Sequence, residues 1–515
     1  GNRYPDVNKA ITQRIEKGSL ILNYTGHGGE TGWAHEEVLT VNDINNWSNY
    51  NYLPVFVTAT CEFIRYDEPV RQSAGEYVFT NPKGGGIALF TTTRPTYGTP
   101  NFELNKKFYQ YALSKPGGQR LRLGDIIMNS KRDKGSNENG RKYVLLGDPA
   151  LKINFPTFSV VTQAINGHSP SAGADTLKAY MEVVIDGFIA DQQGNLLSDF
   201  NGTIYPSVFD KPAVLKTLAN DKGAVYTFSI RKNLLYKGKV AVKNGRFSFT
   251  FIVPKDIAYN YGFGKISYYA TDGTRSAEGS SYNVVIGGSA IPDVADNSGP
   301  EISLYMNNKD FRDGGITDQN ARLLAVVSDE NGINTIGNGI GHDITAVLDG
   351  NTTEPYILNE YYESDINTFK SGYIWFPFSM LSPGEHSLSV KVWDVFNNSS
   401  DAVIRFVVHS SGVMVISKSY NYPNPFSEYT DIVFEHNQQY ADFKTTAEIY
   451  SLSGRLVNVI EQTAQQDGFV SVPLRWNGLD AQGNKVPAGM YVYHLTILTS
   501  NGQFAQTTGK MMFHK

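Results

Sequence analysis

The segments that decide the fold are 20–30, LILNYTGHGGE, and 54–61, PVFVTATC. Each begins with a short apolar run, and a continuous apolar run of this length is typical of a buried parallel strand. The first run is followed by His27 and the second ends at Cys61. Because functional groups collect at the carboxyl ends of such strands, the sequence predicts an α/β domain that brings these two side chains to the same edge of a sheet.

The residues at these strand ends suit nucleophilic catalysis. A cysteine thiol needs a base or an imidazolium partner to become a thiolate near neutral pH. Gly26, Gly28 and Gly29 let the backbone turn sharply beside the histidine and leave room for a substrate carbonyl. We therefore expect His27 as the base, Cys61 as the nucleophile, and the N–H groups of Gly28 and Cys61 as an oxyanion hole. The alternative is an inert thiol and an unrelated turn histidine, which the glycine cluster and the matched strand ends disfavour.

Three motifs resemble those of the gingipain family of cysteine peptidases. Segment 26–33, GHGGETGW, is similar to the family's histidine motif, and 58–61, TATC, to its nucleophile motif. Segment 143–151, YVLLGDPAL, resembles the stretch that closes the catalytic domain. The resemblance covers residues 1–156 and implies a caspase-like (gingipain-type) α/β fold, the base and nucleophile named above, and chemistry without a metal or an organic cofactor.

The amino end of this region is short for a caspase-like domain. An amphipathic helix expected at Val7–Lys17 leads directly into the strand before His27, where such a domain needs further strands. By resemblance, an acid that assists the histidine and part of the specificity pocket lie upstream, so we expect a domain incomplete at its N-terminus. The local candidates for that acid are Glu30, Glu36, Glu62 and Asp67. Solvated turn or surface positions explain each of these better, and the substrate-binding residues stay unassigned.

The α/β pattern continues beyond the nucleophile. Helices are expected at Val70–Thr80, Asn101–Leu113 and Leu123–Lys134. A strand at Ile87–Thr92 is followed by the loop Thr93–Gly98, which we expect near the catalytic edge. Either this loop lines the substrate cleft or it is an ordinary connection, and the sequence leaves both open.

Composition narrows the class of protein. A chain of 515 residues with 41% hydrophobic and 18% charged residues should form several globular domains. A net charge of −5 argues against nucleic-acid binding, and a single cysteine excludes an intramolecular disulfide. No run of about 18 apolar residues predicts a membrane-spanning helix, and no signal peptide is visible.

After Pro156 the pattern changes to successive strands with turn residues between them, which is typical of β-sandwiches. We expect one sandwich at 157–286, a Gly-, Ser- and Pro-rich linker at 287–300, and an immunoglobulin-like sandwich at 301–410. In the first, strands are expected at Leu177–Phe188, Gly202–Val208, Tyr226–Ile230, Arg246–Val253 and Gly264–Thr271. Asp329–Gly332 and His342-Asp343 could hold a cation, but turn chemistry explains them better, so no metal is predicted.

The last unit, 414–515, is a third expected sandwich. It contains 422–426, YPNPF, and 447–455, AEIYSLSGR. It resembles the C-terminal domain of cargo of the Bacteroidetes type IX secretion system. That resemblance implies a place at the outer membrane or the bacterial cell surface.

The order of a gingipain-like domain, two β domains and this C-terminal domain resembles the sortases of type IX secretion. The implied activity is cleavage of the C-terminal signal domains of cargo and transfer of the acyl group to anionic lipopolysaccharide. The implied partners are those cargo domains, the lipopolysaccharide acceptor and PorV, an outer-membrane β-barrel shuttle protein. Two alternatives stay open: a secreted, gingipain-like degradative endopeptidase, and a non-enzymatic surface adhesin that binds through residues 157–515.

Overall fold

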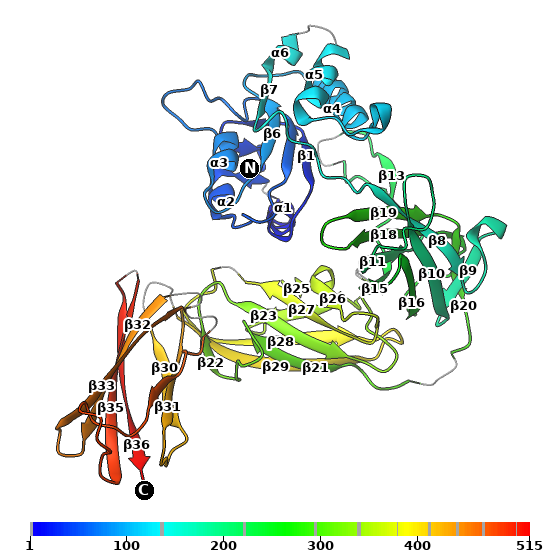
Figure 1. The fold of residues 1–515 in the computed structure, drawn as a ribbon. Coiled ribbons are helices and arrows are strands. Elements are labelled where there is room, and N and C mark those ends of the chain that lie inside the picture. Colours follow the sequence, from blue (N-terminus) through cyan, green and yellow to red (C-terminus); the bar gives the residue numbers. More distant parts are fainter. Residues whose placement is uncertain are drawn as a thin grey trace. The chain divides into compact units, whose positions relative to one another are not determined.

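The structure is a computed structural model, and it describes residues 4–133, 138–219, 223–292, 296–336, 341–378, 380–409, 414–438, 442–465, 469–500 and 502–514. The chain divides into two compact units, Gly1–Phe155 and Pro156–Lys515. The first combines helices with a mostly parallel sheet, and the second is built mainly of strands (Figure 1). An α/β domain followed by β domains is thus confirmed.

The N-terminal unit is organised around a sheet with the strand order β1-β5-β6-β7. Its strands are β1 (Ile21–Thr25), β5 (Val55–Ala59), β6 (Ala88–Thr92) and β7 (Tyr143–Leu146). The first three run parallel, and β7 is antiparallel to β6. Every residue of β5 and β6 is buried, as expected for strands that are covered on both faces.

Helices cover both faces of this sheet (Figure 1). They are α1 (Pro5–Lys17), α2 (Val41–Asn46), α3 (Ala74–Thr80), α4 (Gly98–Ala112), α5 (Leu123–Asp133) and α6 (Glu138–Lys142). Successive strand residues point to opposite faces. Val55 and Val57 therefore pack with α4 and α5, whereas Phe56 packs with α1, α2 and α3.

Several helix boundaries differ from those expected: α1 starts at Pro5 rather than Val7, and α4 spans Gly98–Ala112 rather than Asn101–Leu113. The helix predicted to start at Val70 starts at Ala74, because Ser73 and Glu76 form a capping box. The backbone N–H of Ser73 donates to the Glu76 carboxylate at 2.7 Å. The helix predicted to reach Lys134 is described to Asp133, and Lys134 lies outside the described residues.

A small three-stranded sheet carries the histidine motif. It consists of β2 (Gly28–Gly29), β3 (Gly32–Trp33) and β4 (Leu39–Thr40), paired in that order. Trp33 is fully buried and stacks on Tyr24, with ring centroids 4.4 Å apart and planes 4° from parallel. This stacking ties the small sheet to the end of β1.

The first part of the C-terminal unit has a hydrophobic core of residues between Val160 and Ile286, to which Ile336 also belongs. Its strands are β8 (Phe158–Ile165), β9 (Asp175–Ala179), β10 (Glu182–Ala190), β11 (Gly202–Phe209), β12 (Ala213–Lys216), β13 (Thr227–Ile230), β14 (Leu234–Lys237), β15 (Val240–Val242), β16 (Arg246–Ile252), β17 (Gly262–Phe263), β18 (Lys265–Thr271), β19 (Ser276–Ser281) and β20 (Val284–Ser289). One sheet has the order β14-β11-β18-β19-β8-β10-β16, and another the order β17-β20-β9.

Two expectations for this part need correction. The single strand predicted at Leu177–Phe188 is two strands in different sheets, because the chain turns at Tyr180, whose φ is +67°. The linker predicted at 287–300 begins inside β20, which continues to Ser289 because Ser289 pairs with Ala179 of β9. Within that range, residues 293–295 lie outside the described residues.

The next part has its own core of residues between Met306 and Val408. Its strands are β21 (Glu301–Met306), β22 (Gly315–Thr317), β23 (Arg322–Ser328), β24 (Thr345–Leu348), β25 (Tyr356–Ile357), β26 (Tyr362–Ser364), β27 (Ser371–Pro377), β28 (Gly384–Trp393) and β29 (Ser399–Val408). They form two sheets, β21-β23-β27-β26 and β22-β29-β28-β24-β25.

The last part is again a pair of sheets, β30-β31-β34 and β33-β32-β35-β36, around a core that includes the buried Trp476. Its strands are β30 (Ile416–Tyr422), β31 (Thr430–His436), β32 (Asp442–Ser451), β33 (Leu456–Gln465), β34 (Leu474–Trp476), β35 (Gly489–Thr499) and β36 (Phe504–Phe513). Across the described residues, we find no helix with the length and apolar character that crossing a bilayer requires.

Candidate active site

His27 and Cys61 follow neighbouring strands at the same distance. In the parallel pair of β1 and β5, Thr25 is aligned with Ala59. Each candidate lies two residues beyond this aligned pair, and the N–H of Gly26 donates to the carbonyl of Ala59 at 3.2 Å. The register therefore brings both residues to the same edge of the sheet, as the sequence predicts.

The two strand-end loops touch at Gly28. A Cβ atom on Gly28 would lie 2.3 Å from Oγ1 of Thr60, so only glycine fits this approach. Thr60 immediately precedes Cys61. The backbone N–H groups of Gly28 and Cys61, which the sequence predicts as an oxyanion hole, thus belong to loops in contact with each other.

The backbone at His27 is held while its side chain stays accessible. The Tyr24 hydroxyl donates to the His27 carbonyl at 2.7 Å, and the Ala34 N–H donates to the same oxygen at 2.8 Å. The imidazole is exposed, and its ring centroid lies 6.1 Å from that of His35 in a stacked arrangement. An exposed imidazole on a fixed backbone can meet a substrate and exchange protons with it.

The Cys61 thiol is half-buried and contacts Thr96. The Thr96 N–H donates to Sγ at 3.3 Å, and Sγ lies 3.6 Å from the Thr96 carbonyl oxygen. Both residues of the expected dyad are described, and no hydrogen bond joins Cys61 to the His27 imidazole. Thr96 belongs to the loop expected near the catalytic edge, so that placement is confirmed, whereas its contact with the thiol has no signal in the sequence.

Residues 1–154 match the model of peptidase family C25. This segment is a C25 peptidase domain. Residues 431–502 match the model of the FlgD Ig-like domain. The two family matches therefore lie at opposite ends of the chain, with the β domains of 157–410 between them.

Several solved structures are similar to this chain. Dimeric latent PorU from Porphyromonas gingivalis is 29% identical, with 100% of this chain and 47% of that chain covered and a TM-score of 0.34. The complex of the RgpB pro- and mature domains, also from Porphyromonas gingivalis, is 16% identical, with 56% and 57% covered and a TM-score of 0.27. The chain thus spans about half the length of these proteins. The curated proteins gave no match.

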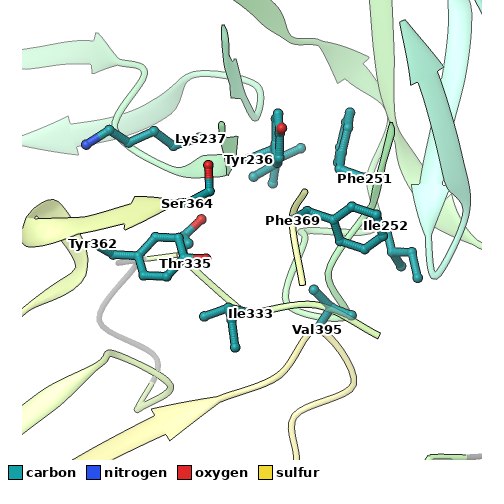
Figure 2. Close-up of a pocket in the computed structure, with 11 residues that line it drawn as sticks. Tyr236, Lys237, Phe251, Ile252, Ile333, Thr335, Tyr362, Ser364, Phe369 and Val395 are labelled. Carbon is teal, nitrogen blue, oxygen red and sulfur yellow. The ribbon is translucent and has the colours of Figure 1, made fainter. Parts of the chain in front are cut away.

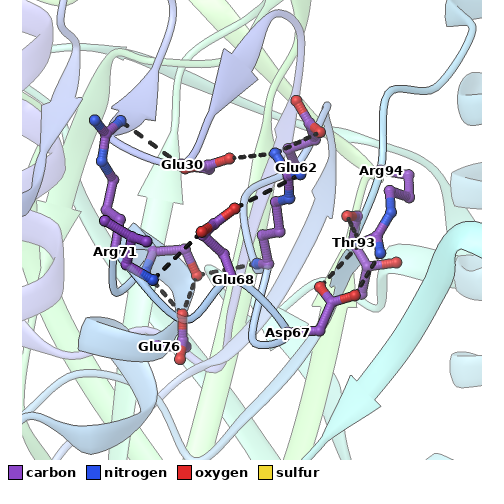
Figure 3. A network of polar contacts seen from close by, with 11 residues as sticks. Glu30, Glu62, Asp67, Glu68, Arg71, Glu76, Thr93 and Arg94 are labelled. Carbon is purple, nitrogen blue, oxygen red and sulfur yellow. Dashed lines mark hydrogen bonds and ion pairs between the residues drawn. The ribbon is translucent and has the colours of Figure 1, made fainter.

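The four local candidates for an acid beside the histidine have other surroundings, and Figure 3 shows three of them, Glu30, Glu62 and Asp67. Arg65 lies 2.8 Å from the Glu30 carboxylate and 3.6 Å from that of Glu62. The Arg94 guanidinium pairs with Asp67 and lowers the pKa of that carboxyl. Glu36 acts on Tyr24, whose pKa is raised by burial and further by this negative charge. None of these described carboxylates hydrogen-bonds to His27.

An open cavity of about 310 Å³ adjoins the loop that carries Thr96. Its lining residues are Tyr66, Asp67, Thr93, Arg94, Glu138, Arg141 and Lys142. The Lys142 ammonium contacts the Glu138 carboxylate at 2.7 Å and the Pro95 carbonyl at 2.8 Å. The lining is polar and charged, and it lies on the side of Cys61 opposite to β1, because β6 and β7 follow β5 in the sheet.

A second cavity lies among the β domains and is lined by Tyr236, Phe251 and Phe369, among others (Figure 2). Its volume of about 10 Å³ is enough for one water molecule at most. This cavity is a packing defect between sheets, and we assign it no ligand.

The turn residues considered for a cation divide into two groups. Asp329 lies with Asp296 and Asp394, and one oxygen of each is within 4.8 Å of the others. Burial raises the pKa of Asp394 to about 6. His342 instead hydrogen-bonds to Asp256 at 2.7 Å. A cluster of carboxylates alone does not establish a metal site, and the absence of a metal stays a prediction.

Proposed function

We propose that this protein is a cysteine peptidase in which Cys61 is the nucleophile and His27 is the base. The observation that carries the proposal is the aligned end of β1 and β5, together with the contact between Gly28 and Thr60. They support the proposal because the residues that carry the thiol, the imidazole and the two backbone N–H groups follow neighbouring strands of the segment that matches family C25.

The reaction follows from these groups. The Cys61 thiolate attacks the carbonyl carbon, and the N–H groups of Gly28 and Cys61 stabilise the negative oxygen that forms. The C–N bond then breaks while His27 donates its proton to the leaving amine, leaving a thioester on Cys61. Water or a second amine then attacks the thioester carbonyl and gives a proton to His27. The C–S bond breaks, which releases the acid or the new amide and restores the Cys61 thiolate.

For the biological role, we propose a sortase of type IX secretion at the bacterial cell surface or outer membrane. Its substrates would be the C-terminal signal domains of secreted cargo, its acceptor an amine of anionic lipopolysaccharide, and its docking partner PorV. The C25 match at the N-terminus, the Ig-like match at the C-terminus and the motifs quoted above support this role. A degradative endopeptidase would share the chemistry but cut unrelated proteins after a defined side chain.

The test removes the nucleophile and, separately, the base. In cells, Cys61→Ala should abolish release of mature cargo and leave folding intact, because the change removes little volume. His27→Ala should slow alkylation of Cys61 near neutral pH, because the thiolate loses its imidazolium partner. Ser114→Ala is a matched control, since it removes one hydroxyl at the end of α4.

Two results would contradict the proposal. Cells that carry Cys61→Ala and release mature cargo at the wild-type rate would rule out this nucleophile. An alkylation profile that is the same in His27→Ala and in the unaltered protein would show that the two side chains are not paired. A purified chain that processes no peptide at all but binds to surfaces through residues 157–515 would favour the adhesin.

A further inference from the structure

Three hydrogen bonds fix the loop after β6, Thr93–Gly98, against Cys61. At its start, the Thr93 N–H donates to the Lys142 carbonyl at 2.9 Å. At its end, the Tyr97 carbonyl accepts from Nδ2 of Asn139 at 3.0 Å. Between them, the Thr96 N–H donates to Cys61 Sγ at 3.3 Å. The loop therefore has a defined position against the thiol.

The Thr96 side chain fixes this position further. Its hydroxyl donates to the Thr60 carbonyl at 2.9 Å and accepts from Nδ2 of Asn101 at 2.8 Å. A hydroxyl that donates and accepts at once has little rotational freedom. The Thr60 carbonyl also accepts from the Thr92 hydroxyl at 2.6 Å. Two hydroxyl groups thus hold the peptide unit that leads into Cys61.

Asn101 in turn is oriented by Asn139. Nδ2 of Asn139 donates to Oδ1 of Asn101 at 3.0 Å, and Oδ1 of Asn139 accepts from the Tyr97 N–H at 3.3 Å. Asn101 is 5% exposed and Asn139 is 3% exposed. A buried amide whose donors and acceptor are used can adopt one orientation only, since any other leaves a buried polar atom unpaired. The chain of contacts from Asn139 to the thiol is therefore rigid.

We propose that Asn139, Asn101 and Thr96 are positioning residues that hold the Thr96 N–H on Cys61 Sγ and thereby favour the thiolate. A hydrogen bond donated to the charged form of a group stabilises that form and lowers its pKa. The inference rests on the proposed function only in that it takes Cys61 as the nucleophile. It adds a second source of thiolate stabilisation, on the side of Cys61 opposite to His27 in the sheet.

The alkylation rate of the whole chain measured against pH tests this inference directly. Cys61 is the single cysteine, so iodoacetamide reports this thiol alone. Thr96→Val keeps the backbone N–H and the side-chain shape but removes the hydroxyl contacts with Thr60 and Asn101 and the 3.8 Å contact of the hydroxyl with Sγ. We therefore expect the midpoint of the alkylation rate against pH to rise by about one pH unit. Thr96→Ser keeps the hydroxyl, so its alkylation midpoint should equal that of the unaltered protein. Asn139→Ala should raise the midpoint in the same direction as Thr96→Val.

Asn49→Ala is the matched control. Asn49 is 1% exposed and bonds to both the N–H and the carbonyl of Gly85, at 2.8 and 3.0 Å. Its replacement removes comparable hydrogen bonds in the same domain without touching the loop after β6. The control should lower the unfolding temperature and leave the alkylation midpoint unchanged. An equal shift in the control would show general loosening and overturn the proposal, as would unchanged midpoints in folded Thr96→Val and Asn139→Ala.

A measurement on the unaltered protein covers the case in which the variants do not fold. With ¹⁵N-labelled threonine, the Thr96 amide resonance should shift with the titration of Cys61, and this shift should vanish in Cys61→Ala. A Thr96 resonance that does not follow the thiol would overturn the proposal. Neither readout uses a peptide substrate, so lost cleavage with a normal alkylation profile would count against the proposed function instead.

Discussion

At the scale of single residues, burial decides which groups make stability depend on pH. His436 on β31 is 1% exposed, and its Nε2 has no hydrogen-bond partner among the described residues. Its ring packs against Phe443 with centroids 4.6 Å apart. Burial lowers the pKa of His436 from 6.5 to about 4, because a proton would add a charge in an apolar surrounding.

This lowered pKa predicts that the C-terminal domain is less stable against unfolding at acid pH. The unfolded chain binds the proton more tightly than the folded one, so the contribution of His436 is complete above a pH of 6.5 and is lost as the pH falls toward about 4. The free energy of unfolding should fall by at most about 3 kcal/mol over this range. His436→Phe should remove this loss, since phenylalanine fills similar space without titrating.

Hydrogen exchange of β31 and β32 in the whole chain, corrected for the intrinsic pH dependence of exchange, measures this loss. His494→Phe is the control, because His494 belongs to the same domain but is partly exposed beside Glu448. If the C-terminal domain of His436→Phe still loses stability at low pH, groups other than His436 cause that loss.

At the scale of elements, the approach of the small sheet to β5 sets the geometry of the site. Gly28 and Gly29 form β2 together, yet only the first faces Thr60. A Cβ at Gly28 would lie 2.3 Å from Thr60 Oγ1, whereas a Cβ at Gly29 would have no neighbour within 4 Å. The two glycines therefore offer a matched pair of substitutions within one strand.

Gly28→Ala should separate the two strand-end loops that carry His27 and Cys61. We expect it to lower kcat/KM for a peptide by at least about tenfold, because overpacking shifts the backbone and small displacements of the proposed reacting groups are costly. Gly29→Ala should leave kcat/KM within about twofold of the unaltered protein, since open space surrounds it. Peptide cleavage and thermal unfolding of both variants check this. Equal activity in the two variants would show that the contact with Thr60 does not position the site.

At the scale of the whole molecule, the chain joins a peptidase domain to β domains with three main hydrophobic cores. The C-terminal unit includes the Ig-like match at residues 431–502. A sortase has to stay at the membrane to meet each cargo protein. We therefore propose that the domain at 414–515 persists in the working protein and docks on an outer-membrane partner, with residues 157–410 as a spacer. Sandwich edges are suited to such docking.

Deletion of residues 414–515 tests this arrangement. The shortened protein should be released into the medium, and cargo should remain unprocessed on cells, while a soluble peptide is still cut if the catalytic domain is complete. The full chain with Cys61→Ala is the control, since it should remain on the cell and cut neither substrate. A shortened protein that stays on the membrane, or a surface enzyme that already lacks this domain, would contradict the docking model.

The sequence by itself determined the features that depend on near neighbours in the chain. The buried strands β5 and β6 were predictable because each is a continuous apolar run, and α4 and α5 because their apolar residues recur at helical spacing. The chemistry of a cysteine and a glycine-flanked histidine at two strand ends was predictable for the same reason. The break at Tyr180 was not, since a single left-handed residue leaves the apolar pattern intact.

Only the tertiary structure decided which distant groups meet. Thr96 reaches Cys61 because β6 lies beside β5, and Asn139 reaches Asn101 because α6 returns to the start of α4. Arg65 and Arg94 engage acids that the sequence left as candidates for assisting His27. Such contacts join residues tens of positions apart. Strand order and loop paths fix them, and the free energy that selects those paths comes from burying whole faces of the sheet rather than from any local pattern.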